Sequence, residues 1–340
     1  MWRVLGAGAG RAGLGGCVVM SQKLVFMFAG QGSQYYRMGQ ELYEQHAGFR
    51  ECLDGGSRLA EGALGVSLVD LLYGPGAQRS QPFERTRFTH PAIFLVNLGV
   101  ATALRAEGLV PAAVLGYSLG EMVAWTVAGA LTLEAALRFV IQTAALVEDG
   151  TPAAGMLAVL ASPTLPAERP EVFAGTTVAC TNYPGHFVVA GRRPDLLRAQ
   201  TLLRAQDVVC QVLPIQHGFH SPMLDPIRDP LRAMAQGLKA ATPRLPVVSC
   251  MAGKTLTAAE FTPEYCWQVW RAPVRFAKTI QGLEAEGAPW VYVDAGPSGT
   301  LAGFAQRVPG KHPASRALAV LSPFGADLRN LARVKRELGG

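Results

Sequence analysis

The residues best suited to chemistry in this sequence form a short, glycine-bounded run around one serine. Gly116-Tyr117-Ser118-Leu119-Gly120 fits the pattern G-x-S-x-G, with an apolar strand-like segment before it and a helical segment after it. At such a turn the glycines allow a tight bend that lifts the serine hydroxyl clear of the sheet, and the helix N-terminus offers free N–H groups to an oxyanion. The pattern predicts Ser118 as a nucleophile. The alternative is an ordinary glycine-rich turn in which Ser118 only caps a helix.

A serine nucleophile needs a neighbouring base, and His220 is the best candidate. It lies in Gln216–Pro222 (QHGFHSP), just after a segment predicted to form a small insert, so that it would face a cleft between two parts of the chain. His46 and His312 lie in polar stretches that we expect to be exposed. The alternative for His220 is a purely structural role.

Strands and helices alternate around the serine. Short apolar runs predict strands at residues 24–28 and 114–115, and a loop at residues 29–34 follows the first. Helical patterns cover residues 91–106, 122–130 and 133–147. This alternation favours an α/β fold with a parallel sheet covered on both faces.

A different pattern begins near Gly155 and ends near Leu213. Strands are predicted at residues 156–160, 177–180, 187–190 and 208–213, with a helix at residues 196–205. This pattern favours a small α+β insert with an antiparallel sheet. After Pro214 the chain returns to the large domain, with a helix near residues 222–238, a strand near 290–293 and a terminal helix near 328–338.

We therefore expect a large domain from residues 23–150 and 214–340, and a small subdomain from residues 151–213. Residues 1–22 are expected to be a flexible extension. They contain G-x-G-x-x-G, but a dinucleotide site needs a strand before the glycines and a helix after them, and only five residues precede the first glycine. That motif is rejected.

Composition excludes several classes of protein. Hydrophobic residues are 49% of the 340 residues and charged residues 16%, which suits a large buried core. No apolar run approaches the roughly 20 residues that span a bilayer. The net charge of +6 is dispersed, without the basic stripe that binds nucleic acid. The six cysteines lack metal-ligand spacing and are expected to be buried thiols in a reducing, cytoplasmic compartment.

Five motifs occur in an order that resembles the malonyl-CoA:acyl-carrier-protein transacylase family, and most closely the free-standing acyltransferases of polyketide synthases that lack built-in acyltransferase domains. The resemblance spans about Lys23 to Arg307. Its motifs are Gly30–Gln34, Gly116–Glu121, His217–Pro222, Ala272–Phe276 and Asp294–Pro297.

The resemblance implies an α/β-hydrolase-like large domain with an inserted ferredoxin-like small domain, and an active site between them. It implies that Ser118 is acylated and that His220 is the base, oriented by the Ala272 carbonyl rather than by an Asp. The N–H groups of Gln31 and Leu119 would form the oxyanion hole. It also implies no metal and no cofactor beyond the CoA or phosphopantetheine of the substrate, acyl carrier protein domains as partners, and a monomer.

Three positions depart from the family pattern but keep polar atoms. Tyr117 stands where the family usually has His, and His90 where it usually has Gln before a Pro. In Asn182-Tyr183-Pro184-Gly185-His186 the family's last residue is Gln and here it is His186. With Phe219, which precedes the base, these residues are expected to line the acyl pocket.

The departure with the largest chemical consequence is Thr143. Malonyl-specific family members carry an Arg 25 positions after the nucleophile, which clamps the malonyl carboxylate. Here that position is Thr143, its neighbour is Gln142, and Arg138 lies five positions earlier, where it projects to another face of the helix. Burying an unpaired carboxylate costs several kcal/mol. Malonyl is therefore expected to be a poor substrate, unless an Arg from elsewhere takes this place.

Two activities fit such a site. One is hydrolysis of stalled acyl groups from carrier proteins through an acyl-Ser118 ester. Free-standing family members that lack the Arg resemble this group of editing hydrolases. The other is transfer of acetyl or another uncharged acyl group. A non-catalytic carrier-binding homologue is the alternative of a different class, and the intact Ser118 and His220 count against it.

Overall fold

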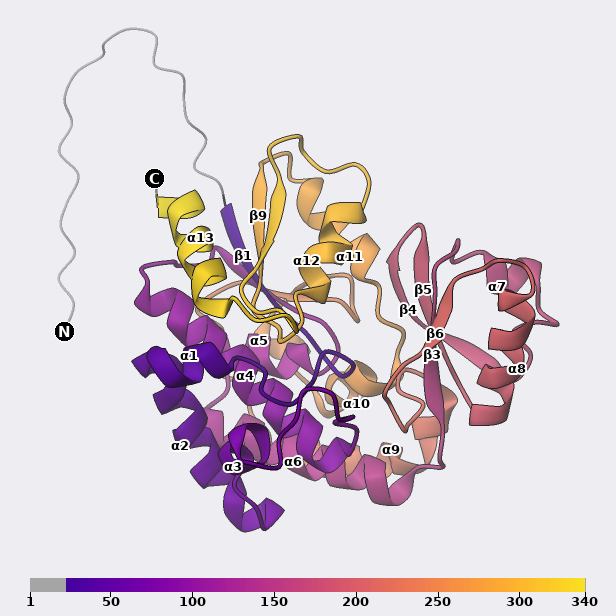
Figure 1. Ribbon diagram of the computed structural model, residues 1–340, viewed down its shortest axis with the longest axis horizontal. Helices are drawn as coiled ribbons and strands as arrows, with labels where there is room; N and C mark the ends of the chain where they lie inside the picture. The colour runs from indigo at the N-terminus through magenta and orange to yellow at the C-terminus, as the bar shows by residue number, and fades with distance from the viewer. Residues whose placement is uncertain (1–22, 340) are drawn as a thin grey trace, which may run out of the picture.

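The computed structural model describes residues 23–339, and two β-sheets organise this part of the chain. Figure 1 shows the larger sheet among most of the helices, whereas strands β3–β6 form a lobe at one end of the molecule. The fold is an α/β large domain with a small ferredoxin-like subdomain. The extension predicted for residues 1–22, and the glycine motif rejected within it, lie outside the described residues.

The larger sheet has six strands in the order β10-β9-β1-β2-β7-β8. Neighbouring strands are parallel except β8, which is antiparallel to β7. The strands are β1 (Lys23–Phe28), β2 (Ala113–Gly116), β7 (Val247–Ser249), β8 (Lys254–Leu256), β9 (Trp290–Asp294) and β10 (Arg316–Ala319). Because Phe28 lies opposite Gly116 in the parallel pair, the loop after β1 and the turn after β2 leave the same edge of the sheet.

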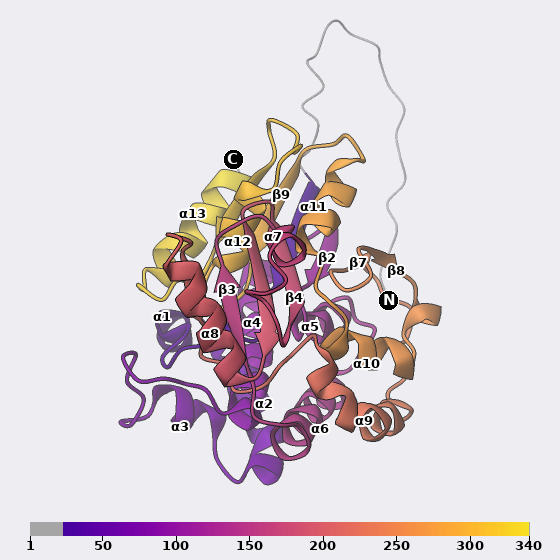
Figure 2. The same cartoon turned by 90° about the vertical axis from the view of Figure 1, so that its right-hand side faces the viewer.

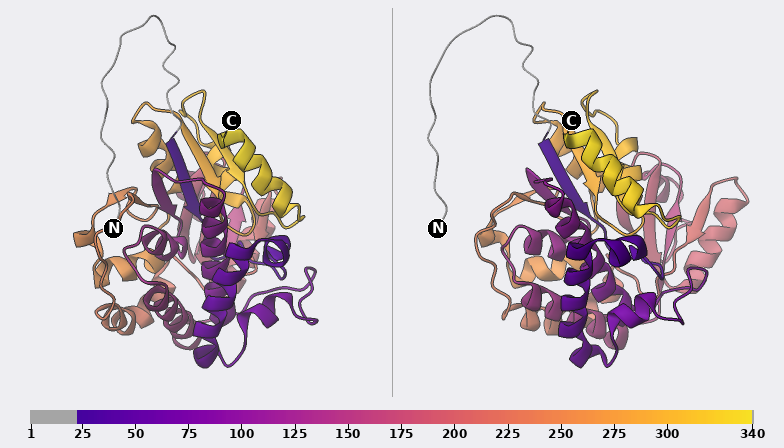
Figure 3. Two further views of the ribbon diagram at one scale, coloured as in Figure 1. Left: turned by 90° about the vertical axis from the view of Figure 1, so that its left-hand side faces the viewer. Right: turned by 60° about the vertical axis from the view of Figure 1, so that its left-hand side comes forward.

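Some helices of the large domain pack on this sheet, and others pack mainly on one another. They are α1 (Gln40–Gln45), α2 (Ala47–Leu64), α3 (Leu68–Tyr73), α4 (Thr86–Ala106), α5 (Gly120–Val127), α6 (Leu133–Gly150), α9 (Arg228–Ala235), α10 (Pro263–Arg271), α11 (Phe276–Glu284), α12 (Thr300–Arg307) and α13 (Asp327–Gly339). Helix α5 packs on β1, β2 and β7, while α2, α4 and α6 pack on one another. Figure 3 shows the C-terminal helix α13, in yellow, beside β10 and α1.

The small subdomain is an antiparallel sheet in the order β4-β5-β3-β6. Its elements are β3 (Gly155–Val159), β4 (Thr176–Tyr183), β5 (His186–Gly191), β6 (Cys210–Val212), α7 (Leu165–Glu168) and α8 (Arg193–Arg204). Side chains of a strand alternate between the faces of its sheet. Leu157 and Val159 pack on the side of α8, which crosses the sheet in Figure 2, whereas Met156 and Ala158 join the core of the large domain. The large domain thus covers the sheet face opposite to α8.

The predicted elements agree with the structure apart from their ends and one helix. The helix expected at residues 222–238 is a 3₁₀ helix at Pro222–Ile227 followed by the short α9. Pro226 lacks the N–H that a continuous α-helix needs there. Helix α5 ends at Val127 rather than Ala130, because Gly129 adopts a φ of 75° that stops it. The domain boundaries at residues 150 and 214 stay predictions.

Replacing Gly120 by Ala is expected to lower the free energy of unfolding by about 3 kcal/mol. A Cβ there would lie 2.0 Å from the Phe28 carbonyl oxygen, which belongs to a strand and cannot move away. The matched control is Gly62→Ala on the exposed side of α2, where no atom lies within 4 Å of the new Cβ. It should stabilise by about 0.5–1 kcal/mol. Urea unfolding measures both, and equal stabilities of the two variants would contradict the packing argument.

Candidate active site

Ser118 lies at the sharp turn between β2 and α5. Its φ is 55°, in the left-handed region that non-glycine residues rarely adopt. The turn closes because its two glycines have no side chain: a Cβ at Gly116 would lie 2.3 Å from the Glu121 Cα, and one at Gly120 would strike β1. Tyr117 N–H donates to the Phe28 carbonyl at 3.0 Å, which ties the turn to β1. This is the strained strand-to-helix geometry expected of a nucleophilic serine.

His220 lies within hydrogen-bond distance of the serine. Its Nε2 is 2.8 Å from Ser118 Oγ, and its Nδ1 is 2.8 Å from the Ala272 carbonyl oxygen. A carbonyl only accepts, so Nδ1 carries the proton and donates it to Ala272, which leaves Nε2 free to accept the serine proton. The His220 backbone, with a φ of 59°, is held by the bond from its N–H to the Trp270 carbonyl at 2.8 Å.

Burial keeps the His220 ring neutral. The side chain is almost completely buried, and this desolvation lowers its pKa from 6.5 to about 4, although the bond to Ala272 acts in the opposite direction. A neutral imidazole is the form that accepts a proton, so the ring is in its basic form throughout the neutral range. The geometry suits general-base activation of Ser118. The catalytic roles of both residues remain predictions.

The loop at residues 29–34 lies against the serine turn. A Cβ at Gly30 would be 3.0 Å from Ser118 Cβ and 3.3 Å from the Leu119 nitrogen, so only glycine allows this approach. Gln31 follows directly, and its amide Nε2 donates to Thr89 Oγ1 at 2.9 Å. The approach brings the backbone of the Gln31 loop to that of Leu119, as an oxyanion hole formed by their two N–H groups requires. That assignment stays a prediction.

A chain of polar side chains leads from the serine turn into a cleft. Tyr117 Oη donates to Asn182 Oδ1 at 3.0 Å, and Asn182 Nδ2 is 2.9 Å from His186 Nδ1. Burial lowers the pKa of His186 to about 4, so His186 is neutral. Tyr117, Asn182 and His186 thus form one hydrogen-bonded chain, and none of the three side chains is charged.

The cleft has a volume of about 430 Å³ and lies between the small sheet and the large domain. Its wall includes the loop at residues 29–33, Tyr117, Asn182 and His186, together with side chains of β3, β5, β6 and α12. None of the residues that line it is charged. The lining of this cleft therefore suits an uncharged ligand.

His90 and Phe219 pack on the other side of the base. The His90 ring is completely buried, lies 5.1 Å from the Trp270 ring and 5.3 Å from the Phe219 ring, and burial lowers its pKa to about 3. Thr143 is also completely buried, on α6, which packs against the helix that carries His90. The structure thus places Thr143, His90 and Phe219 in the protein interior.

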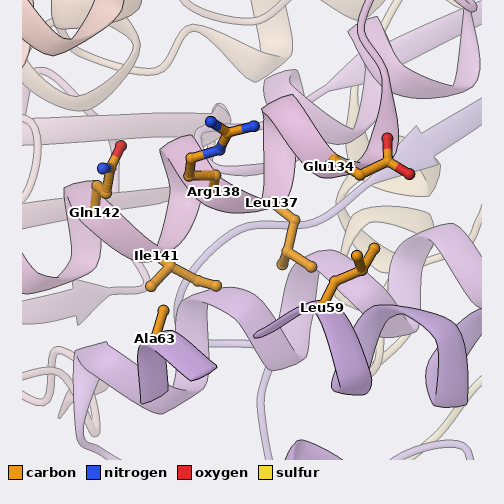
Figure 4. Close-up of a pocket in the computed structure, with 7 residues that line it drawn as sticks. All are labelled: Leu59, Ala63, Glu134, Leu137, Arg138, Ile141 and Gln142. Atoms are coloured by element: carbon orange, nitrogen blue, oxygen red, sulfur yellow. The ribbon is translucent and has the colours of Figure 1, made fainter. Parts of the chain in front are cut away.

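The expectation that Gln142 lines the acyl pocket is wrong. Gln142 is exposed on α6 and borders surface pockets with Arg138. Figure 4 shows both side chains projecting from α6 on the side away from Leu59 and Ala63. Residues four apart share one helix face, whereas Thr143, one position on, is turned by about 100° toward the interior. Arg138 therefore does not replace the missing arginine of the Thr143 position.

Sequence reasoning missed the carboxylate that follows the serine turn. Glu121 is completely buried and accepts from Ser249 Oγ at 2.8 Å, from the Met251 N–H at 2.9 Å and from Tyr265 Oη. Burial raises its pKa to about 7. Tyr265 belongs to α10, whose C-terminal residues supply both carbonyls that hold His220. The sequence feature that could have identified Glu121 is its place directly after G-x-S-x-G.

Two further observations apply to the part of the chain that the structure describes. Residues 23–339 contain no group of three or more His, Cys, Asp or Glu side chains arranged to hold a metal ion. Over the same residues, no helix is both long and apolar enough to cross a bilayer.

The pH dependence of Ser118 reactivity tests the neutral state of His220. Labelling with a fluorophosphonate should stay constant from about pH 8 to about pH 5 and fall at lower pH, since a protonated ring cannot accept the serine proton. The midpoint should lie near the lowered His220 pKa of about 4. Tryptophan fluorescence at each pH shows whether the protein is still folded. A midpoint near the ordinary histidine value of about 6.5 would contradict the effect of burial.

Comparison with known proteins places these features in a family. The family model described as "Acyl transferase domain" matches residues 25–323. The chain is 35% identical over 316 residues to the polyketide biosynthesis acyltransferase homolog BaeD of Bacillus velezensis, covering 93% of this chain and 97% of BaeD. It is 33% identical over 316 residues to the homolog PksD of Bacillus subtilis, with the same coverage.

Solved structures of acyltransferases have the same fold as this chain. The loading acyltransferase from the avermectin modular polyketide synthase superimposes with a TM-score of 0.85 at 26% identity, covering 93% of this chain and 100% of that one. The malonyl CoA-acyl carrier protein transacylase of Coxiella burnetii, 24% identical with a TM-score of 0.79 over 95% of this chain and 99% of its own, shares the fold. The resemblance and the fold class predicted from the motifs are confirmed: this chain belongs to the acyl transferase domain family and is a relative of the polyketide biosynthesis acyltransferase homologues.

Proposed function

We propose that this protein is an acyl-thioester hydrolase of polyketide biosynthesis, which removes uncharged acyl groups from acyl carrier proteins. In the first half-reaction Ser118 Oγ attacks the thioester carbonyl while its proton passes to His220 Nε2. The Gln31 and Leu119 N–H groups stabilise the oxyanion. The C–S bond breaks, and the leaving thiolate takes the proton from His220. An acyl-Ser118 ester and a free carrier thiol result.

The second half-reaction uses the same residues in reverse. A water gives its proton to His220 Nε2 and attacks the ester carbonyl, and His220 then protonates Ser118 Oγ as the C–O bond breaks. The products are a carboxylic acid and the free enzyme. The Ala272 carbonyl needs no charge to keep the ring in the tautomer that both steps require, which supports a base without a third acidic member.

The observation that carries the choice of substrate is the absence of a buried cation. Among residues 23–339 no Lys or Arg side chain is buried, and Thr143 holds the position of the family's malonyl clamp. A malonyl carboxylate entering this interior would lose its hydration without gaining a partner, at a cost of several kcal/mol. An uncharged acyl group avoids this cost, so acetyl, butyryl and other uncharged groups should fit better than malonyl.

The neutral cleft supports a carrier-bound substrate. Its volume of about 430 Å³, its lack of charged lining residues and its contact with the Gln31 loop suit the amide-containing phosphopantetheine arm. The arm would lie in the cleft and present its thioester to Ser118. No cofactor or metal takes part in the proposed steps, and a monomer suffices, since every residue named here belongs to one chain.

Acyl transfer is the second candidate, because the avermectin relative is a loading acyltransferase. Both activities share the first half-reaction and differ in whether water or a thiol attacks the ester. Intact-protein mass spectrometry of a panel of acyl carrier proteins separates them. Loss of the acyl group with release of free acid supports hydrolysis, and appearance of the acyl group on a second, unloaded carrier protein supports transfer.

Ser118→Ala and His220→Ala are each expected to lower the rate of acyl loss by at least about 10³-fold, because the ester cannot form or the hydroxyl is not activated. The control is Ser162→Ala, an exposed serine of the small subdomain, which should keep the full rate. Retention of more than about a tenth of the rate by either active-site variant would contradict the mechanism.

Wild-type protein is expected to load acetyl or butyryl onto Ser118 faster than malonyl, and Thr143→Arg should narrow this gap by supplying a guanidinium. Gln142→Arg is the matched control: it adds the same side chain one position away on the exposed face, so the selectivity should not change. Mass spectrometry of the acyl-enzyme measures each rate. If wild-type protein loads malonyl fastest, Thr143 does not set the selectivity.

A further inference from the structure

On helices α4, α6 and α10, four buried side chains have polar atoms without a hydrogen-bond partner among the described residues. They are Thr86 Oγ1, both ring nitrogens of His90, Thr143 Oγ1 and Trp270 Nε1. Each of these side chains is at most 1% exposed. Buried polar atoms in proteins are nearly always paired, so four such residues in neighbouring helices require an explanation. We call them the polar cluster.

The polar cluster is spread over α4, α6 and α10, and α4 packs on α6 and contacts α10 through the His90 and Trp270 rings. Thr86 and His90 are four residues apart and share one face of α4. Thr143 lies on α6, which packs on α4, and Trp270 lies on α10 with its ring stacked on His90. The Trp270 carbonyl accepts from the His220 N–H, and the Phe219 ring beside His90 directly precedes the base. His90 and Trp270 of the cluster therefore lie beside His220, the residue that contacts Ser118.

The chemistry of the polar cluster is uncharged but able to form hydrogen bonds in both directions. A neutral imidazole offers one donor and one acceptor, an indole one donor, and each threonine hydroxyl both. His90 is neutral because burial lowers its pKa to about 3. A hydroxyl or keto oxygen satisfies such groups, whereas a plain alkyl chain leaves them unpaired and a carboxylate meets no cation.

We propose that the acyl groups this enzyme accepts best carry an uncharged oxygen, a hydroxyl or a keto group, that the polar cluster binds. This inference rests on the proposed function and specifies its substrate class. A site built to bond a substrate oxygen discriminates strongly against the analogue that lacks it, because its own polar atoms are then left unpaired. The cluster would thus select partly processed, oxygenated chains over saturated ones.

The test compares butyryl thioesters with 3-hydroxybutyryl, 4-hydroxybutyryl and 3-oxobutyryl thioesters, which differ by one oxygen. Acyl-enzyme formation on wild-type protein is followed by intact-protein mass spectrometry. At least one oxygenated chain should load about tenfold or more faster than butyryl. If butyryl loads as fast as all three, solvent alone satisfies the polar cluster and the inference is overturned. If no thioester loads, the proposed function itself fails.

Variants of the polar cluster test which residues cause the preference for oxygenated acyl groups. Thr143→Val keeps the shape of the side chain and removes its hydroxyl, and His90→Phe keeps a ring against Trp270 and removes both nitrogens. Each should reduce the ratio of oxygenated to butyryl loading by about tenfold. Gln142→Val, on the exposed face of α6, should leave the ratio unchanged. A ratio that survives in both cluster variants would overturn the assignment, even if one of them folds poorly.

Discussion

At the turn between β2 and α5 three backbone segments come within contact distance, and the position of Ser118 depends on this contact. The end of β1, the turn itself and the start of α5 meet where glycines at 116 and 120 leave no Cβ in the way. The crowding holds Ser118 in the left-handed region. The same parallel pairing of β1 with β2 brings the loop after β1 against the Leu119 nitrogen. The position of Ser118, its backbone strain and the approach of the loop at residues 29–34 therefore have one cause.

His220 is held by hydrogen bonds to backbone carbonyls rather than by a charged side chain. Two carbonyls near the end of α10, those of Trp270 and Ala272, fix the backbone and the ring of His220. Glu121 connects this helix to the serine turn, since its carboxylate accepts from Tyr265 on α10 and from the segment after β7. Ser118 and His220 come from segments about a hundred residues apart. A buried hydrogen-bond network links the helices beside them without placing a carboxylate next to the imidazole.

Among residues 23–339, no buried Lys or Arg side chain lies in the interior around His220. Imidazoles in a buried, uncharged setting stay neutral, and His90, His186 and His220 all have lowered pKa values for this reason. An interior without a buried cation offers no partner to a carboxylate, and this underlies the proposed preference for uncharged acyl groups.

The motifs around Ser118 and His220 could be predicted from the sequence because they are local: a tight turn needs glycines at set positions, and alternation of apolar runs shows the α/β order. The tertiary structure alone decided which atoms of these segments meet. On α6, Thr143 faces the interior and its neighbour Gln142 faces solvent. The spacing from the serine did not distinguish these two adjacent positions. Packing of α4, α6 and α10 gathered the polar cluster, and burial made Glu121 a structural link. Both features depend on contacts between segments that are far apart in the sequence. The periodicity of apolar residues along the chain does not reveal such contacts.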